Sequence, residues 1–265
     1  MKCLCAYFMK TVKKSKQIIY GIIFLIFSAI IYVFAFVNSI SQDILYHNFA
    51  DTRVLFNITN FWNVISNLPF FLVGIYALYR MIIIKSLVFI DDIKWSYIFL
   101  FLGVALVSFG SGYYHLNPTN ETLVWDRLPM TIAFMALFAI VISEFISIKT
   151  GKQFLFPLLI LGLFSVLYWF FSEMNGYGDL RLYILIQFLP ILIIPIVLIS
   201  FPSLFSHIKG YWLLLLCYVL AKLLEHFDMQ IFTTLSFISG HSLKHIVAAL
   251  GIFLLLRSYE ERVLL

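Results

Sequence analysis

Long apolar runs recur along the chain and are separated by short polar segments. A helix needs about 20 mostly apolar residues to cross the hydrocarbon core of a bilayer. The pattern predicts eight membrane-spanning helices, at residues 17–37, 61–84, 95–115, 125–148, 154–171, 181–201, 211–229 and 241–257. Several short connections carry turn-forming residues, such as Asn117-Pro118. The expected fold is therefore an all-α integral membrane protein with helices that alternate in direction.

The composition agrees with a membrane protein. Only 12% of the 265 residues are charged and the mean hydropathy is +1.01, whereas about 25% charged residues is usual for soluble domains. The three cysteines are Cys3, Cys5 and Cys217, and their positions support neither a disulfide framework nor a cysteine-based metal site. The net charge of +5 is small and lies mostly on one side of the predicted membrane, so nucleic acid is not an expected partner.

The basic residues predict which way the helices point. With the N-terminus in the cytoplasm, all but five of the 18 Lys and Arg residues fall on the cytoplasmic side, as the positive-inside rule requires. The five others are Arg53, Arg127, Arg181, Lys222 and Lys244. The first apolar run follows several lysines but is longer than the apolar part of a signal peptide. We therefore expect an uncleaved first helix and both termini inside.

Polar residues within the predicted spans gather at the outer ends. Ser111 and His115 close the third span, Asp126 opens the fourth, and His241 and His245 open the eighth. Ionisable residues inside a membrane are costly and usually face the interior of the bundle. We expect these side chains to meet in one layer. The inner halves of the spans are nearly all apolar, so a site near the outer surface is favoured over a pathway through the membrane.

Three histidines in this layer suit a metal site. His241 and His245 are four residues apart and share one face of a helix. With His115 as a third ligand, they match the three protein ligands that a catalytic zinc commonly takes. Asp126 could accept a proton from metal-bound water and return it to a leaving group. The alternative is that the histidines are buried, hydrogen-bonded structural groups, because an H-x-x-x-H pair alone is a weak signal.

Other charged residues and histidines receive structural interpretations. Four residues at the end of the seventh span are spaced for an internal network of ion pairs and hydrogen bonds: Lys222, Glu225, His226 and Asp228. A role in orienting a ligand histidine is the secondary interpretation of this group. Long cationic side chains are expected to reach to lipid headgroups, namely Arg127, Arg181 and Lys244. Two loop histidines are expected to be solvated, His47 and His207.

The motifs together resemble the alkaline ceramidase family. They are S-x-x-x-H at 111–115, W-D-R-L-P-M at 125–130, H-x-x-x-H at 241–245 and N-F-W-N-V-I-S-N at 60–67. In detail the chain is similar to a bacterial, alkaline or phytoceramidase-like branch. The family belongs to the CREST group of seven-span membrane hydrolases, which also includes the adiponectin receptors. The resemblance covers roughly residues 45–257.

The resemblance implies a seven-helix CREST-type bundle at residues 41–265, preceded by a basic tail and an extra transmembrane helix at residues 1–40. It implies that zinc is bound by His115, His241 and His245. It further implies that Asp126 orients or deprotonates the metal-bound water and that Ser111 stabilises the oxyanion formed when water attacks an amide. The expected substrate is a ceramide-like N-acyl lipid of the bilayer, cleaved to a fatty acid and a sphingoid base. The expected location is the bacterial inner membrane, with the site toward the periplasm.

The chain departs from the family in two features, the extra N-terminal span and the position before the first core helix. Eukaryotic ceramidases place a calcium site near the start of the first core helix, built from several acidic groups. Here Asn60 precedes that helix, and Asp51 is the only carboxylate in residues 46–60, which argues against calcium. Two other functions stay open: a lipid receptor of the adiponectin-receptor type with a structural zinc, and a small-molecule transporter. The lack of a soluble N-terminal domain disfavours the first, and the apolar inner halves disfavour the second. The sequence does not specify the oligomeric state.

Overall fold

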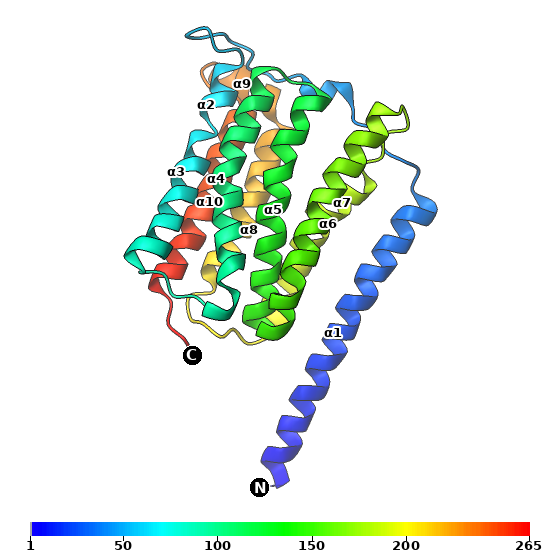
Figure 1. Ribbon diagram of the computed structural model, residues 1–265, viewed down its shortest axis with the longest axis vertical. Coiled ribbons are helices and arrows are strands. Elements are labelled where there is room, and N and C mark those ends of the chain that lie inside the picture. The colour runs from blue at the N-terminus through cyan, green and yellow to red at the C-terminus, as the bar shows by residue number, and fades with distance from the viewer. Residues whose placement is uncertain (1) are drawn as a thin grey trace.

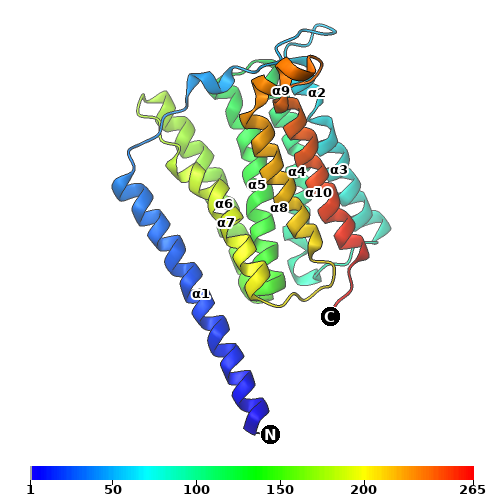
Figure 2. The same cartoon turned by 180° about the vertical axis from the view of Figure 1, so that it is seen from behind.

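A bundle of packed helices and one separate long helix make up the protein (Figure 1 and Figure 2). The computed structural model describes residues 2–265, with side chains from Lys16 onward. Helix α1 (Lys2–Phe36) stands apart from the bundle in both views and contacts it mainly through α7 (Arg181–Ser200). The backbone of the predicted N-terminal tail is helical and forms the first part of α1. The side chains that lie outside the described part include those of Cys3, Cys5 and four of its lysines, Lys2, Lys10, Lys13 and Lys14.

The bundle contains seven helical segments. They are α2–α3 (Phe61–Ile65 and Leu68–Tyr79), α4 (Lys94–Leu116), α5 (Asn120–Phe145), α6 (Ile148–Met174), α7, α8 (Lys209–His226) and α10 (Gly240–Glu261). The short helix α9 (Asp228–Leu235) joins α8 to α10, and short turns of helix lie at Ile44–His47, Arg80–Ile84 and Asp91–Ile93. This arrangement confirms the predicted all-α fold, a seven-helix bundle with one additional N-terminal helix.

Seven of the described helices are long and apolar enough to cross a membrane, and α1 is one of them. The chain is therefore a multi-pass membrane protein. Helix α8, which was predicted as a span, is not among the seven, because it carries Lys209, Lys222 and Glu225 within 18 residues. It nevertheless lies along the bundle and packs against α10 (Figure 2).

Polar residues set the helix ends, and these ends differ from the predicted ones. The predicted span 211–229 breaks at Phe227, where α8 stops and α9 begins. Helix α5 begins five residues before the predicted start, because the Thr119 side chain caps it. Ser147 likewise caps α6 well ahead of the predicted 154. Hydropathy detects the apolar part of a helix, whereas the helix itself extends to its cap.

The end of the bundle near the C-terminus contains a buried charged cluster. Glu144 forms an ion pair with Arg262 at 2.9 Å, and both side chains are almost fully buried. Its two oxygens also accept hydrogen bonds from the hydroxyls of Tyr97 and Tyr211, at 2.5 and 2.8 Å. The expectation that the inner halves are apolar fails here. The partners come from distant parts of the chain and together satisfy the carboxylate, as a buried charge requires.

Candidate metal site and cavity

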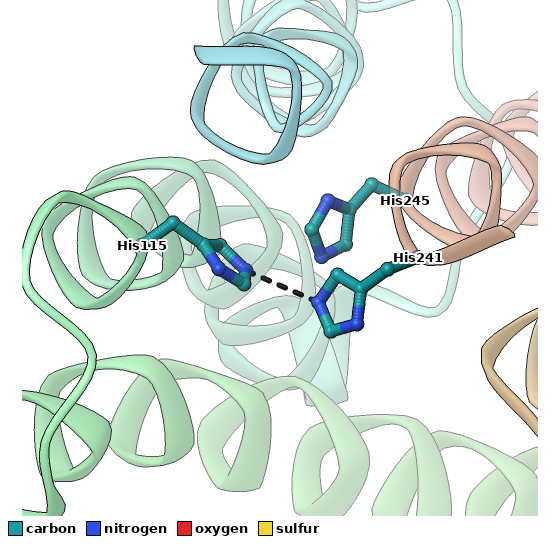
Figure 3. A group of neighbouring side chains, drawn as sticks. All are labelled: His115, His241 and His245. Atoms are coloured by element: carbon teal, nitrogen blue, oxygen red, sulfur yellow. Dashed lines mark hydrogen bonds between the residues drawn. The ribbon is translucent and has the colours of Figure 1, made fainter. Parts of the chain in front are cut away.

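Three buried histidines from two helices face one another at the end of the bundle opposite the two termini (Figure 1 and Figure 3). His115 is on the last turn of α4, and His241 and His245 are one turn apart at the start of α10. One ring nitrogen of each lies within 4.8 Å of the other two. The Nε2 atoms of His115 and His241 are 3.3 Å apart. The structure thus brings together the three histidines that the sequence singled out, and the group could hold a metal ion.

One pair of these nitrogens has the spacing of two ligands at a tetrahedral zinc centre. Zinc–nitrogen bonds are about 2.0–2.1 Å long, which places two ligand nitrogens of a tetrahedral centre about 3.4 Å apart. The observed 3.3 Å between His115 and His241 agrees with that value. His245 turns its Nδ1 toward the Ser66 hydroxyl, at 2.8 Å, which leaves its Nε2 for the cluster. Imidazole nitrogen is a ligand that zinc accepts readily.

The first turn of α10 is held in place by Asp228, at the start of α9. One carboxylate oxygen of Asp228 accepts the backbone N–H of His241 at 2.6 Å, and the other accepts the N–H of Ala50 at 2.9 Å. Gly240 allows this approach, because a Cβ there would overlap the carbonyl oxygen of Leu224 in α8. The position of His241 therefore depends on a close contact that only glycine permits.

Side chains of the N-F-W-N-V-I-S-N stretch form hydrogen bonds to both helices that carry the histidines, α4 and α10. The Asn60 side chain donates to the backbone carbonyl of His115 at 2.8 Å. The side-chain oxygen of Asn63 accepts a hydrogen bond from the Ser242 hydroxyl, also at 2.8 Å, and the Ser66 hydroxyl contacts His245. The sequence identified this stretch only through the family resemblance and assigned its residues no roles. The available signal was four polar residues in an otherwise apolar stretch, all of which are buried in the structure: Asn60, Asn63, Ser66 and Asn67.

Asp126 and Ser111 lie next to each other where α4 and α5 approach closely. A Cβ at Gly110 would overlap the carbonyl oxygen of Trp125, so this glycine lets the two helices meet one residue before Ser111 and Asp126. Both side chains line the same cavity as His245. The predicted carboxylate and serine are thus on the cavity side of the histidine group.

A cavity of about 330 Å³ occupies the centre of the bundle. Its walls are mostly apolar and come from α4, α5, α7, α8 and α10, with residues such as Val104, Met130 and Ile252. Polar side chains gather near the histidines. Helices α7 and α8 both line the cavity but pack little against each other. Helix α7 packs against α5 and α6, and α8 packs against α10. An apolar chain of a lipid fits such walls.

Lys244 does not reach to the headgroups, in contrast to the prediction. Its ammonium forms an ion pair with Glu225 and lines the cavity. Lys222 also pairs with Glu225, at 2.7 Å, which agrees with the predicted internal ion pair. Asp228 belongs instead to the support of His241. Two cations from different helices therefore share one carboxylate at the polar end of the cavity.

Three other predictions about exposed residues are wrong for a common reason. Arg127 is buried, with its guanidinium 4.1 and 4.6 Å from the rings of Trp169 and Tyr183. Arg181 pairs with Asp179 at 2.7 Å. The two ring nitrogens of His47 lie 2.9 and 3.0 Å from the Tyr114 hydroxyl and the Asn120 side-chain oxygen. Apart from Asp179, these partners are distant in sequence from the residues that they contact, so a local sequence pattern does not reveal them. His207 is exposed, as predicted.

The segment that precedes α2 is held by contacts of its own side chains. The Asp51 carboxylate accepts hydrogen bonds from the Arg53 guanidinium at 2.8 and 2.6 Å. Asn60 is engaged with the backbone of His115. Phe49, in the same segment, packs its ring against His115 and His241, with ring centroids 4.7 and 4.5 Å away. This segment covers the histidine group.

The chain matches the sequence model of a known protein family. No curated protein matches the chain significantly. The sequence model of the family described as Ceramidase matches residues 48–260, a range that includes Ser111, Asp126 and the three histidines. The range also runs from the Phe49 segment through nearly all of α10. Because the match covers most of the chain, the protein belongs to the ceramidase family.

Proposed function

We propose that the protein is a zinc-dependent amidase that hydrolyses ceramide-like N-acyl lipids within the membrane, releasing a fatty acid and a sphingoid base. The observation that carries this proposal is the group of His115, His241 and His245, which meets an apolar cavity beside Asp126 and Ser111. Membership of the ceramidase family supplies the reaction class, which is hydrolysis of an amide bond.

We further propose that residues 41–265 form the catalytic domain and that residues 1–40 add a basic tail and an extra transmembrane helix. The site would face the periplasm from the bacterial inner membrane. In support, most Lys and Arg residues outside the spans lie at the end that carries the C-terminus, away from the histidines.

The histidines would hold the metal, and the neighbouring side chains would carry out the proton transfers. A bound zinc would act as a Lewis acid and would make a water molecule acidic enough to serve as the nucleophile at neutral pH. Asp126 accepts the proton of the attacking water and returns it to the nitrogen of the leaving amine. Ser111 donates a hydrogen bond to the amide oxygen as negative charge develops on it. The apolar walls hold the acyl chain so that the amide lies at the polar end of the cavity.

Metal analysis combined with lipid turnover tests this proposal. Purified protein should contain about one zinc per chain. The variants His115→Ala and His245→Ala should lose it, whereas His207→Ala, which changes an exposed histidine, should keep it. Full retention of zinc in both cluster variants would refute the metal site.

A receptor with a structural zinc is the alternative, and one variant separates the two functions. Asp126→Asn should retain zinc but release no fatty acid from N-acyl lipids, as measured by mass spectrometry. Unchanged hydrolysis would contradict the role of Asp126. An absence of hydrolysis in the wild-type protein across a panel of N-acyl lipids would favour the receptor.

A further inference from the structure

The polar end of the cavity has more positive than negative side chains. Its cations are Arg127, Lys222 and Lys244, and its carboxylates are Asp126 and Glu225. A bound zinc would add further positive charge. An unsubstituted ceramide is neutral and offers hydroxyl and amide groups only. The excess of positive charge is therefore a feature that the proposed reaction does not by itself explain.

Glu225 neutralises only one of the two lysines that it contacts. Lys222 on α8 and Lys244 on α10 each donate to a different oxygen of this carboxylate. An ammonium has three N–H donors, and Glu225 is the sole side-chain or backbone acceptor of either lysine among the described residues. Both ammonium groups thus keep unused donors beside the cavity. Their side chains are 39% and 17% exposed, so a ligand can reach them.

Arg127 adds a positive charge without an anionic partner. It donates to the neutral side chain of Gln42 at 2.6 Å and stacks on aromatic rings, and its Nη1 has no hydrogen-bond partner within the described chain. A buried cation that forms no direct ion pair is costly in a low-dielectric interior. An anion bound in the cavity would offset that cost.

We propose that Lys222 and Lys244 bind an anionic group on the amine half of the substrate, an oxyanion such as a carboxylate or a phosphate. The preferred substrate is then an acidic N-acyl lipid rather than a neutral ceramide. The place of Lys244 supports this assignment, because it directly precedes His245 and lines the same cavity. The anion would lie close to the amide bond, which fits a headgroup and not the far end of an acyl chain. This inference rests on the proposed function for the identity of the lipid.

The test measures binding rather than turnover. It uses Asp126→Asn protein in neutral detergent and two matched pairs of lipids. N-oleoyl serine is compared with the neutral N-oleoyl serinol, and N-oleoyl ethanolamine phosphate with N-oleoyl ethanolamine. The anionic member of at least one pair should bind about 10- to 100-fold more tightly, the range expected for hydrogen bonds to a charged group. The pair that shows the preference distinguishes a carboxylate from a phosphate.

The lysine variants connect that preference to the site. Lys222→Met and Lys244→Met should each remove most of it while leaving the affinity for the neutral lipid unchanged, and Lys244→Arg should retain it. Lys209→Met is the matched control, because Lys209 is an exposed lysine on the same helix, α8, and does not line the cavity. Unchanged binding of the neutral lipid also shows that a variant is folded.

The outcomes separate this inference from the proposed function. Equal binding of anionic and neutral lipids by the Asp126→Asn protein would overturn the inference, even if wild-type protein hydrolyses ceramide. A preference that survives in both Lys→Met variants would also overturn it. A preference that depends on the lysines, combined with a wild-type protein that hydrolyses neither ceramide nor any of the four lipids, would support the anion site and contradict the amidase.

Discussion

The contact between Ser66 and His245 leads to a specific prediction about metal affinity. The Ser66 hydroxyl lies 3.2 Å from the backbone carbonyl of Asn63 and 2.8 Å from Nδ1 of His245. A hydroxyl has one proton, which it donates to the carbonyl, so its oxygen accepts from the Nδ1–H of the imidazole. That tautomer places a lone pair on Nε2, the nitrogen that faces the other two histidines. Ser66 therefore prepares His245 to bind a metal.

Replacement of Ser66 by alanine should weaken zinc binding without removing a ligand. A single buried hydrogen bond contributes about 0.5–1.5 kcal/mol. The loss also frees the ring to rotate and to exchange tautomers, and removal of such outer partners typically lowers metal affinity about 10- to 100-fold. That range corresponds to about 1.4–2.7 kcal/mol. We expect the Kd of Ser66→Ala for zinc to rise by this factor.

Competition with a zinc chelator on the purified protein measures this Kd. Ser96→Ala is the matched control, because Ser96 is a fully buried serine whose hydroxyl has no hydrogen-bond partner among the described residues. Its Kd should stay within about twofold of the wild-type value. A wild-type Kd in Ser66→Ala, or an equal loss in Ser96→Ala, would refute the argument.

Three further predictions concern stability, each read from thermal unfolding in detergent. Gly110→Ala should destabilise the protein by about 1–3 kcal/mol through overlap with the Trp125 carbonyl, whereas Gly112→Ala, where a Cβ meets open space, should not. Arg262→Met should cost about 3–5 kcal/mol because it leaves Glu144 buried and unpaired. A second change, Glu144→Leu, should recover part of that loss, and no recovery would contradict the ion-pair argument. Removal of bound metal with a chelator should lower the Tm, and zinc should restore it; an unchanged Tm would contradict metal binding by the folded state.

The bundle was predictable because the bilayer imposes one length and one composition on its helices. Every predicted span has a helix in the structure, including α8, which is not among the seven helices that are long and apolar enough to cross a membrane. The breaks were not predictable in the same way. Phe227, where α8 ends, is itself an apolar residue and gives no signal of a helix end. The break depends on Asp228, whose carboxylate binds backbone N–H groups of two other segments.

The histidines were predictable because each lies near the helix end that is on the same side of the bundle, at the end of α4 and at the start of α10. Depth in the membrane is a one-dimensional quantity that can be counted along a span, so His115 and His245 could be assigned to one layer. The direction of a long cation within that layer cannot be counted. Lys244 and Arg127 were expected to point to the headgroups, but Glu225 and the ring of Trp169, both distant in sequence, hold them inside the bundle.

The distance between the metal-site helices depends on α2 and α3. Both α4 and α10 pack against these two helices, so α2 and α3 connect His115 to His241 and His245. Asn60 and Ser66, at either end of α2, contact the His115 backbone and the His245 ring. This explains in physical terms why a polar stretch interrupts the first core span, at a cost to its stability as a membrane helix. An apolar α2 would fit the bilayer better but would leave the third histidine without a fixed distance from the other two.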